Sequence, residues 1–248
     1  NMAIGQGRHA PPRGLALEAL DQTGRWVVVA PDLGFPAGKN KTVLIDLTPA
    51  AGARRLRLRT NLEVYWDWLA FAEAVDTPLV TTRLQAARAD LRHRGFSRTN
   101  YERRDQPEVP VYQSIANVGQ RWRDLVGYYT RFGDVGELLS RVDDRYVIMN
   151  AGDELQLSFP VPPPPSAGWR RDFVLVGDGW EKDGDYNPSF SETVLPLPSH
   201  DRPDYGVGTG SLELDQDPVY RRHAADWATY HTRFVTPRDF LRGLRLAP

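Results

Sequence analysis

The sequence predicts a mainly β protein, an antiparallel β-sandwich of the jelly-roll kind with a few short peripheral helices near the C-terminus. Three observations predict this class. Short apolar runs recur at spacings of roughly ten to fifteen residues, turn residues separate them, and no regular strand–helix–strand alternation occurs. The 21 glycines and 20 prolines exceed average usage and favour many turns over long helices.

The clearest strand is residues 54–60, in which leucine and arginine alternate strictly. A period of two places alternate side chains on opposite faces of a strand. We therefore expect Leu56 and Leu58 in the core and the arginines, Arg55, Arg57 and Arg59, on the other face. By similar criteria, antiparallel strands are expected over residues 26–30, 42–47, 54–60, 62–68, 146–149, 154–159 and 171–176, with 146–159 forming a hairpin.

Helices are expected mainly near the C-terminus. Residues 218–231 place apolar and aromatic side chains on one helical face, and Thr236-Pro237 is a typical start for a second short helix that reaches Leu244. Residues 83–94 fit either a helix or an alternating strand. Residues 98–120 are polar and are expected to be irregular.

The domain organisation expected from the sequence is an N-terminal arm, residues 1–20, followed by one domain, residues 21–248. This domain contains a long loop, 177–212, which in a compact protein is typically functional or packed by its own aromatic side chains. The only candidate linker is the proline tract at 160–165, but the strand pattern resumes soon after it. Because the chain opens with Asn1-Met2, we expect a processed chain or a piece of a longer one.

Composition excludes several functional classes. The formal net charge is −1, so the chain lacks the basic surface that general nucleic-acid or anionic-membrane binding needs, and we expect no nucleic-acid partner. The absence of cysteine excludes disulfides, thiolate zinc sites, cysteine-ligated iron–sulfur clusters and covalently attached c-type haem. The longest apolar runs, 26–31 and 68–72, are far shorter than the roughly 20 residues that span a bilayer, so no transmembrane segment is expected.

One acidic cluster suggests a calcium site. Asp183, Asp185 and Asn187 have the alternating spacing that directs oxygen ligands to a common centre, as Ca²⁺ requires. The EF-hand pattern would continue with glycine and glutamate, but this chain has Pro188 and Val194 at those positions. The alternative is that these residues simply form turns. Ca²⁺ is therefore the one cofactor that the sequence suggests.

No other motif in the sequence indicates a specific ligand-binding or catalytic site. The glycine-containing loops at 34–39 and 206–211 lack the spacing and the following helix of phosphate and dinucleotide loops. The five histidines form no metal-binding pattern, and no G-x-S-x-G elbow occurs. No catalytic residue can be assigned.

The aromatic side chains are the main binding candidates. Trp66, Trp68, Trp180 and Tyr186 suit either a sugar-stacking platform or a protein-binding surface, although tryptophans in a sandwich are more often structural. A shallow row of coplanar rings would indicate a sugar, and a broad apolar patch with a polar rim would indicate a protein.

Several tracts, taken in order, carry a resemblance to a known family: GFPAGKNKT at 34–42, TNLEVYWD at 60–67, RGFS at 94–97, YTRFGDV at 129–135, VIMNAGDE at 147–154 and DGWEKDGD at 178–185. Together they resemble the carboxy-terminal region of large exported bacterial proteins that carry FG-GAP propeller repeats and an ASPIC/UnbV segment, relatives of cartilage acidic protein. The resemblance implies an extracytoplasmic, non-catalytic module. The chain departs from the family in having no FG-GAP calcium-loop repeats and no ASPIC/UnbV core of its own.

The function expected from these observations is binding or assembly outside the cytoplasm, in the periplasm, at the cell surface or in the medium. The expected partner is a protein or another domain of a larger assembly. The alternatives are a carbohydrate-binding module that uses exposed aromatic rings and an unrecognised hydrolase. A deep pocket with converging carboxylates of shifted pKa would favour the hydrolase.

Overall fold

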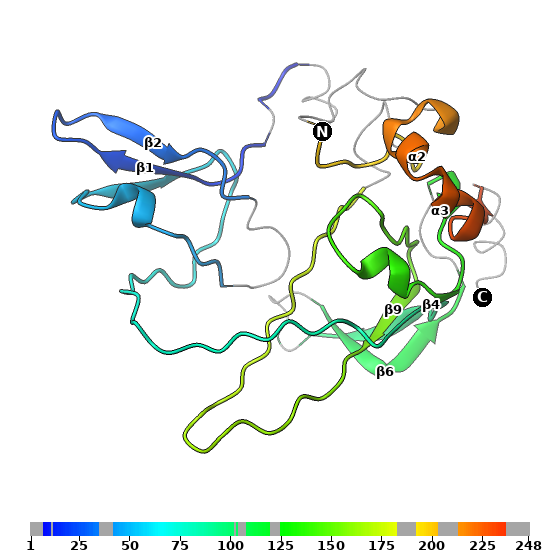
Figure 1. The fold of residues 1–248 in the computed structure, drawn as a ribbon. Coiled ribbons are helices and arrows are strands. Elements are labelled where there is room, and N and C mark those ends of the chain that lie inside the picture. The colour runs from blue at the N-terminus through cyan, green and yellow to red at the C-terminus, as the bar shows by residue number, and fades with distance from the viewer. Residues whose placement is uncertain are drawn as a thin grey trace. The chain divides into compact units, whose positions relative to one another are not determined.

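The computed structural model describes residues 7–10, 12–34, 42–101, 103, 108–119, 125–182, 192–202 and 213–236. This part of the chain is mainly β, with ten strands in small antiparallel sheets and few helices (Figure 1). The strands are β1 (Ala16–Leu20), β2 (Trp26–Ala30), β3 (Leu56–Arg59), β4 (Arg88–His93), β5 (Phe96–Asn100), β6 (Val109–Asn117), β7 (Gly127–Tyr129), β8 (Gly133–Asp134), β9 (Asp153–Ser158) and β10 (Arg233–Val235). The helical elements are the 3₁₀ turns η1 (Thr48–Ala50), η2 (Gly136–Leu139) and η3 (Leu214–Gln216) and the short α-helices α2 (Pro218–Arg222) and α3 (Ala224–Thr229).

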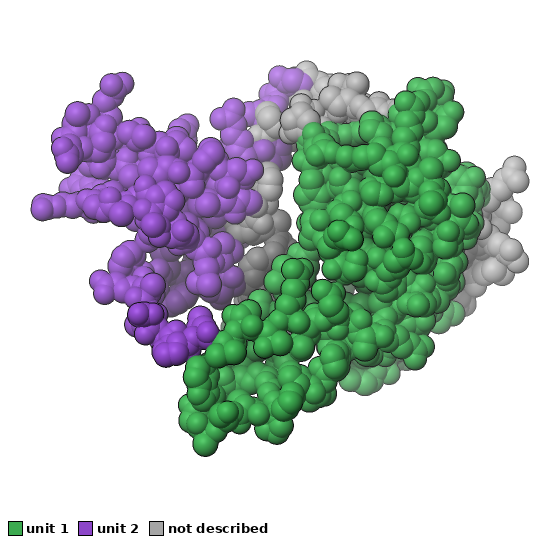
Figure 2. All heavy atoms as spheres, in the orientation of Figure 1, with its two compact units in different colours: residues 1–5, 80–248 green, residues 6–79 purple. Residues whose placement is uncertain are grey.

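The chain divides into two compact units (Figure 2). Residues 6–79 form one, called unit 2, and residues 1–5 with 80–248 form the other, called unit 1. From the sequence we expected an N-terminal arm over residues 1–20, followed by a single domain over residues 21–248. Within that expected arm, β1 is a strand with partners on both sides.

Unit 2 contains a three-stranded antiparallel sheet in the order β2-β1-β3. The central strand buries Leu17 and Ala19, which pack with Ala50 of η1 to form a small core. Leu58 of β3 lies opposite Leu17 and packs against this core, as expected. Burial of Leu17 and its packing against the half-buried Leu58 hold β1 in the sheet.

The other face of β1 carries Glu18, whose side chain is almost buried between two arginines of β3. Arg57 Nε donates to Glu18 Oε2 at 2.5 Å, and Arg59 Nη1 donates to Oε1 at 3.4 Å. The arginine face of β3 was therefore predicted correctly. The prediction for Leu56 was wrong: its side chain is exposed, because β3 pairs with β1 alone among the described strands and the core covers only Leu58.

Four of the expected strands are irregular instead: 42–47, 62–68, 146–149 and 171–176. None of them pairs with a strand in the described residues. In the first, the Asp46 carboxylate accepts hydrogen bonds from the backbone N–H and the hydroxyl of Thr48, which starts η1. The expected hairpin over 146–159 is also absent, because β9 pairs with β4.

Unit 1 is built around the antiparallel sheet β8-β4-β9. Ala89 and Leu91 of β4 are fully buried and pack against Val135 and Leu138. Of the two structures that the sequence allowed for residues 83–94, the protein therefore adopts the strand, over Arg88–His93. Residues 98–120 were expected to be irregular, but β5 and β6 pair there antiparallel. Two shifts in register interrupt the alternation of side chains between the two faces of this pair. The sequence therefore lacks the period-two pattern that would have predicted these strands.

The expected helix over 218–231 is two helices, α2 and α3. The break lies at His223, whose φ of −122° and ψ of 31° are not helical. Val219 and Trp227 are buried on the face that the sequence predicted. The second expected helix, which would reach Leu244, lies outside the described residues apart from Thr236. No helix in the described ranges has the length and apolar character needed to cross a membrane.

Candidate functional site

The segment 192–202 in unit 1 contributes residues to an apolar pocket and to a polar cluster. It begins with a short parallel bridge between Thr193 and Val126. Lys182 holds it in place, because its ammonium donates to the carbonyls of Thr193, at 2.6 Å, and of Leu195. Burial lowers the pKa of Lys182 to about 8. The carbonyl groups of this segment are therefore anchored by a largely buried ammonium group.

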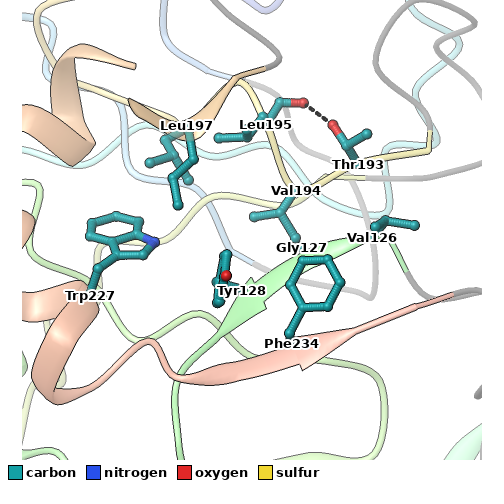
Figure 3. Close-up of a pocket in the computed structure, with 10 residues that line it drawn as sticks. Val126, Gly127, Tyr128, Thr193, Val194, Leu195, Leu197, Trp227 and Phe234 are labelled. Atoms are coloured by element: carbon teal, nitrogen blue, oxygen red, sulfur yellow. Dashed lines mark hydrogen bonds between the residues drawn. The ribbon is translucent and has the colours of Figure 1, made fainter. Parts of the chain in front are cut away.

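The pocket lies between this segment, β7, β10 and α3, and it has a volume of about 250 Å³ (Figure 3). Most of its lining is apolar or aromatic, including Val194, Leu195, Leu197, Tyr128, Phe234 and Trp227. None of its lining residues is charged. Apolar walls of this kind exclude water and favour apolar ligands.

Trp227 lines the inner part of the pocket, and its ring nitrogen is buried. Only 7% of the residue is exposed, and its ring is held edge to face by Tyr220, with centroids 5.3 Å apart, and by His231, at 4.4 Å. Its indole Nε1 has no hydrogen-bond partner among the described residues. In Figure 3 this nitrogen lies on the side of the ring that faces the other lining side chains. Leaving a buried donor unsatisfied costs about 1–3 kcal/mol.

The rim of the pocket is aromatic. Tyr128 and Phe234 face each other across β7 and β10 with ring centroids 4.9 Å apart, and both are half-exposed. Gly127 of β7 also lines the wall, with a φ of +152°. A Cβ added there would lie 2.9 Å from Val194 Cβ, so the close approach of these two segments requires glycine.

His231 is buried behind Trp227. Its Nδ1 lies 3.0 Å from the Thr130 hydroxyl, which accepts the backbone N–H of Ile148 at 2.7 Å. We assign Nδ1 as the acceptor of the hydroxyl proton, with the ring proton on Nε2. Burial lowers the pKa of His231 to about 4, so the ring is neutral at pH 7.

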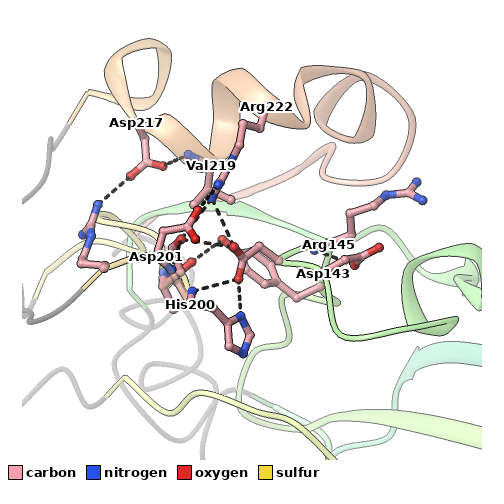
Figure 4. Close-up of polar contacts among 12 residues, drawn as sticks. Asp143, Arg145, His200, Asp201, Asp217, Val219 and Arg222 are labelled. Carbon is pink, nitrogen blue, oxygen red and sulfur yellow. Dashed lines mark hydrogen bonds and ion pairs between the residues drawn. The ribbon is translucent and has the colours of Figure 1, made fainter.

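Asp144 is the centre of the polar cluster, because its carboxylate contacts Ser199, His200 and Arg222. Figure 4 shows the polar contacts of this region, with His200 and Arg222 labelled. The Asp144 φ of 60° is left-handed, a conformation that aspartate tolerates better than most residues. The backbone N–H of His200 donates to Oδ1 at 3.1 Å, and the ring Nδ1 lies 2.5 Å from the same oxygen. Although burial alone raises the pKa of Asp144, hydrogen bonds from His200 and Ser199 hold it below its usual value.

The second ring nitrogen of His200, Nε2, lies 3.0 Å from Asp178 Oδ2, and Trp180 packs edge to face on the ring at 5.5 Å. The hydrogen bond to Asp144 raises the pKa of His200. Both ring nitrogens thus face carboxylates, and the ring ties residues 178–180 to the segment. The Ser199 hydroxyl donates to the other oxygen of Asp144, Oδ2, at 3.2 Å.

Helix α2 joins the cluster through its two ends. At its C-terminal end, Arg222 Nη2 donates to Asp144 Oδ2 at 3.1 Å and to the Ser199 hydroxyl at 3.0 Å. At its start, the fully buried Asp217 accepts the backbone N–H of Val219 at 2.9 Å as the N-cap. Its other oxygen accepts the N–H of Leu197 at 3.1 Å, which links the helix cap to the pocket wall.

The structure places the predicted binding residues in different units. Trp66 and Trp68 are 51% and 71% exposed in unit 2, and Trp180 is 47% exposed in unit 1. The fourth, Tyr186, lies outside the described residues. So do the predicted calcium ligands Asp183, Asp185 and Asn187. Within the described ranges, no group of three or more histidine, aspartate or glutamate side chains is arranged to hold a metal ion.

Sequence reasoning missed the residues that come together here. His200 and Asp144 are 56 positions apart, and no motif links them. Trp227 was found only as part of a helix face. Whether its indole N–H finds a hydrogen-bond acceptor depends on which groups the neighbouring segments place beside it, and no spacing in the sequence encodes their positions.

Comparison with known proteins yields no match for this chain among protein-family models, curated proteins or solved structures.

Proposed function

We propose that this chain is a non-catalytic binding module that joins a protein partner in a larger assembly outside the cytoplasm. The observation that carries the proposal is an apolar segment of unit 1, Phe173-Val174-Leu175-Val176, called here the FVLV segment. Its four side chains are 70–85% exposed. Contiguous apolar surface of this kind marks an interaction site more often than a free surface.

The FVLV segment is anchored on both sides. Before it, Arg171 Nη1 donates to the carbonyl of Pro162 at 3.2 Å, which fixes its start against the proline tract. After it, Asp178 pairs with His200, and Lys182 binds the carbonyls of segment 192–202. Between these anchors, no backbone hydrogen bond joins the FVLV segment to another described residue.

The chemistry of the FVLV segment favours one kind of partner. A continuous run of aromatic and branched residues is typical of a strand that is buried on both faces. Its backbone, which has no hydrogen-bond partner among the described residues, suits addition to the exposed sheet edge of another protein. In such an addition, main-chain hydrogen bonds supply affinity and side-chain pockets supply specificity. Burial of each large side chain contributes about 1.5–3 kcal/mol.

Two further expectations belong to this proposal. The location outside the cytoplasm is supported by the resemblance to exported bacterial proteins described above. The antiparallel β-sandwich of the jelly-roll kind is proposed as the fold of this chain, and the antiparallel pairing of the described strands supports it.

The test uses a photo-crosslinking amino acid at Leu175 in cells that produce the protein. Val161 is the matched control, because it is an isolated apolar residue that is similarly exposed. We expect one protein to be crosslinked reproducibly from position 175 and not from position 161. With that protein purified, Leu175→Glu should weaken binding at least tenfold by calorimetry, and Val161→Glu less than twofold.

Three results contradict the proposal. Equal crosslinking from both positions means that the FVLV segment is not a binding site. Crosslinks to a second copy alone assign it to self-association. Binding to an oligosaccharide array that is lost in Trp66→Ala and Trp68→Ala supports the carbohydrate-binding alternative.

A further inference from the structure

The pocket beneath Tyr128 and Phe234 has the organisation of a small-molecule site. The two half-exposed rings form its rim, and the buried Trp227 and Leu197 form its inner part. No lining residue belongs to the FVLV segment, so this site can be tested separately from the proposed function.

The volume of the pocket limits the size of its ligand. A dry cavity of about 150 Å³ in another protein binds benzene, which has six carbon atoms. By the same proportion, the 250 Å³ here accommodate about ten non-hydrogen atoms. This corresponds to one aromatic ring with a short substituent.

The lining determines the chemistry of the ligand. With no charged side chain in the wall, a charged ligand would lose its hydration without compensation, so the ligand is neutral. The Trp227 indole can only donate a hydrogen bond, and its donor is unsatisfied among the described residues. Contacts with Tyr220 and His231 hold its ring in place, so the donor is preorganised for an acceptor atom.

We infer that this pocket binds a small neutral organic molecule with one hydrogen-bond acceptor, such as an aryl ketone, whose oxygen accepts the Trp227 indole N–H. The apolar part of the ligand contacts Val194, Leu195 and Leu197, and its ring lies beneath Tyr128 and Phe234, whose own rings are in edge-to-face contact.

The experiment compares acetophenone with cumene, which has a similar size and shape but no acceptor. The full chain is labelled with ¹⁵N at its tryptophans, and the indole N–H signals are followed during titration with each compound. Acetophenone should bind about tenfold more tightly than cumene, and only acetophenone should move the Trp227 indole proton downfield.

Trp227→Phe keeps a ring and removes the donor, so it should lose this signal and reduce the preference for the ketone to less than twofold. Trp169→Phe is the control, because Trp169 is half-exposed and does not line the pocket; it should retain the preference. Equal affinities for the two compounds in the unmodified protein, or an unchanged Trp227 signal, overturn the inference. Both measurements use the unmodified protein, so they test the inference even if Trp227→Phe does not fold.

Discussion

Arg145 and Asp226 form a two-point ion pair that ties the loop after η2 to helix α3. Arg145 Nε donates to Asp226 Oδ2 at 2.9 Å, and Nη2 donates to Oδ1 at 2.7 Å. The same Nη2 donates to Glu137 Oε1 at 3.1 Å. The hydrogen bonds from Arg145 hold the pKa of Asp226 below its usual range, although burial of the carboxylate raises it. The pair positions the helix that carries Trp227, so it supports the pocket.

Removing the arginine should leave a buried carboxylate without its counter-ion. Arg145→Met is expected to lower the free energy of unfolding by about 3 kcal/mol, as breaking a buried ion pair does. Arg145→Lys should lose less, because it keeps the charge without the two-point geometry. Urea denaturation measures both. Arg141→Met is the control: its side chain is exposed and pairs with Asp143 at 3.5 Å, so a loss below about 0.5 kcal/mol is expected.

Asp217 should be the most sensitive position at the start of α2. Asp217→Ala removes the N-cap and also the acceptor of the Leu197 N–H, and it is expected to lower stability by about 2 kcal/mol. Asp217→Asn retains cap chemistry and should lose less. Asp215→Ala, at an exposed position in η3, is the matched control in thermal unfolding. Equal effects at positions 215 and 217 would contradict this role.

Stability should decrease as the pH falls from 6.5 to 4 because of His231. Its pKa is about 4 in the folded protein and about 6.5 in the unfolded chain, so in this range the unfolded state binds more protons. The expected loss is about 3 kcal/mol across the window. His231→Gln should flatten this dependence when denaturation is followed at pH 6.5, 5.5 and 4.5. A variant that keeps the full dependence would show that other groups cause it.

His200 should act in the opposite direction and in a different window. Its pKa is raised in the folded state, chiefly by the hydrogen bond to Asp144, so its contribution is fully present below pH 6.5 and is lost as the pH rises through the raised value. Melting temperatures between pH 6 and 8.5 should therefore fall more steeply in the unmodified protein than in His200→Gln. Parallel profiles would show that the tether to Asp178 does not depend on the ring charge.

Calcium binding by Asp183, Asp185 and Asn187 stays a prediction. If these residues bind Ca²⁺, a concentration about 100-fold above the dissociation constant should stabilise the protein by about 2.7 kcal/mol. Asp183→Asn with Asp185→Asn should abolish the increase in melting temperature, whereas Asp172→Asn, at an exposed position, should not. No increase at millimolar Ca²⁺ in the unmodified chain would exclude the site.

Local patterns in the sequence determined the β-rich class, the alternation along β3 and the start of α2. Each depends on residues that are close together in the chain. Leu58 and Arg57 point to opposite faces because of the pleat alone, and Asp217 caps the helix that begins at the next residue.

Tertiary structure decided which apolar runs became strands and which polar residues met. A strand needs a partner for its backbone. The apolar FVLV segment pairs with none of the described strands and is not a strand, whereas β6 is one because β5 pairs with it. In the same way, the packing of segments 192–202 and 143–148 on the helices brings Asp144 to His200. It also leaves the Trp227 indole without an acceptor among the described residues. Hydrogen bonds between distant segments depend on the whole fold, and the spacing of residues along one segment carries no information about them.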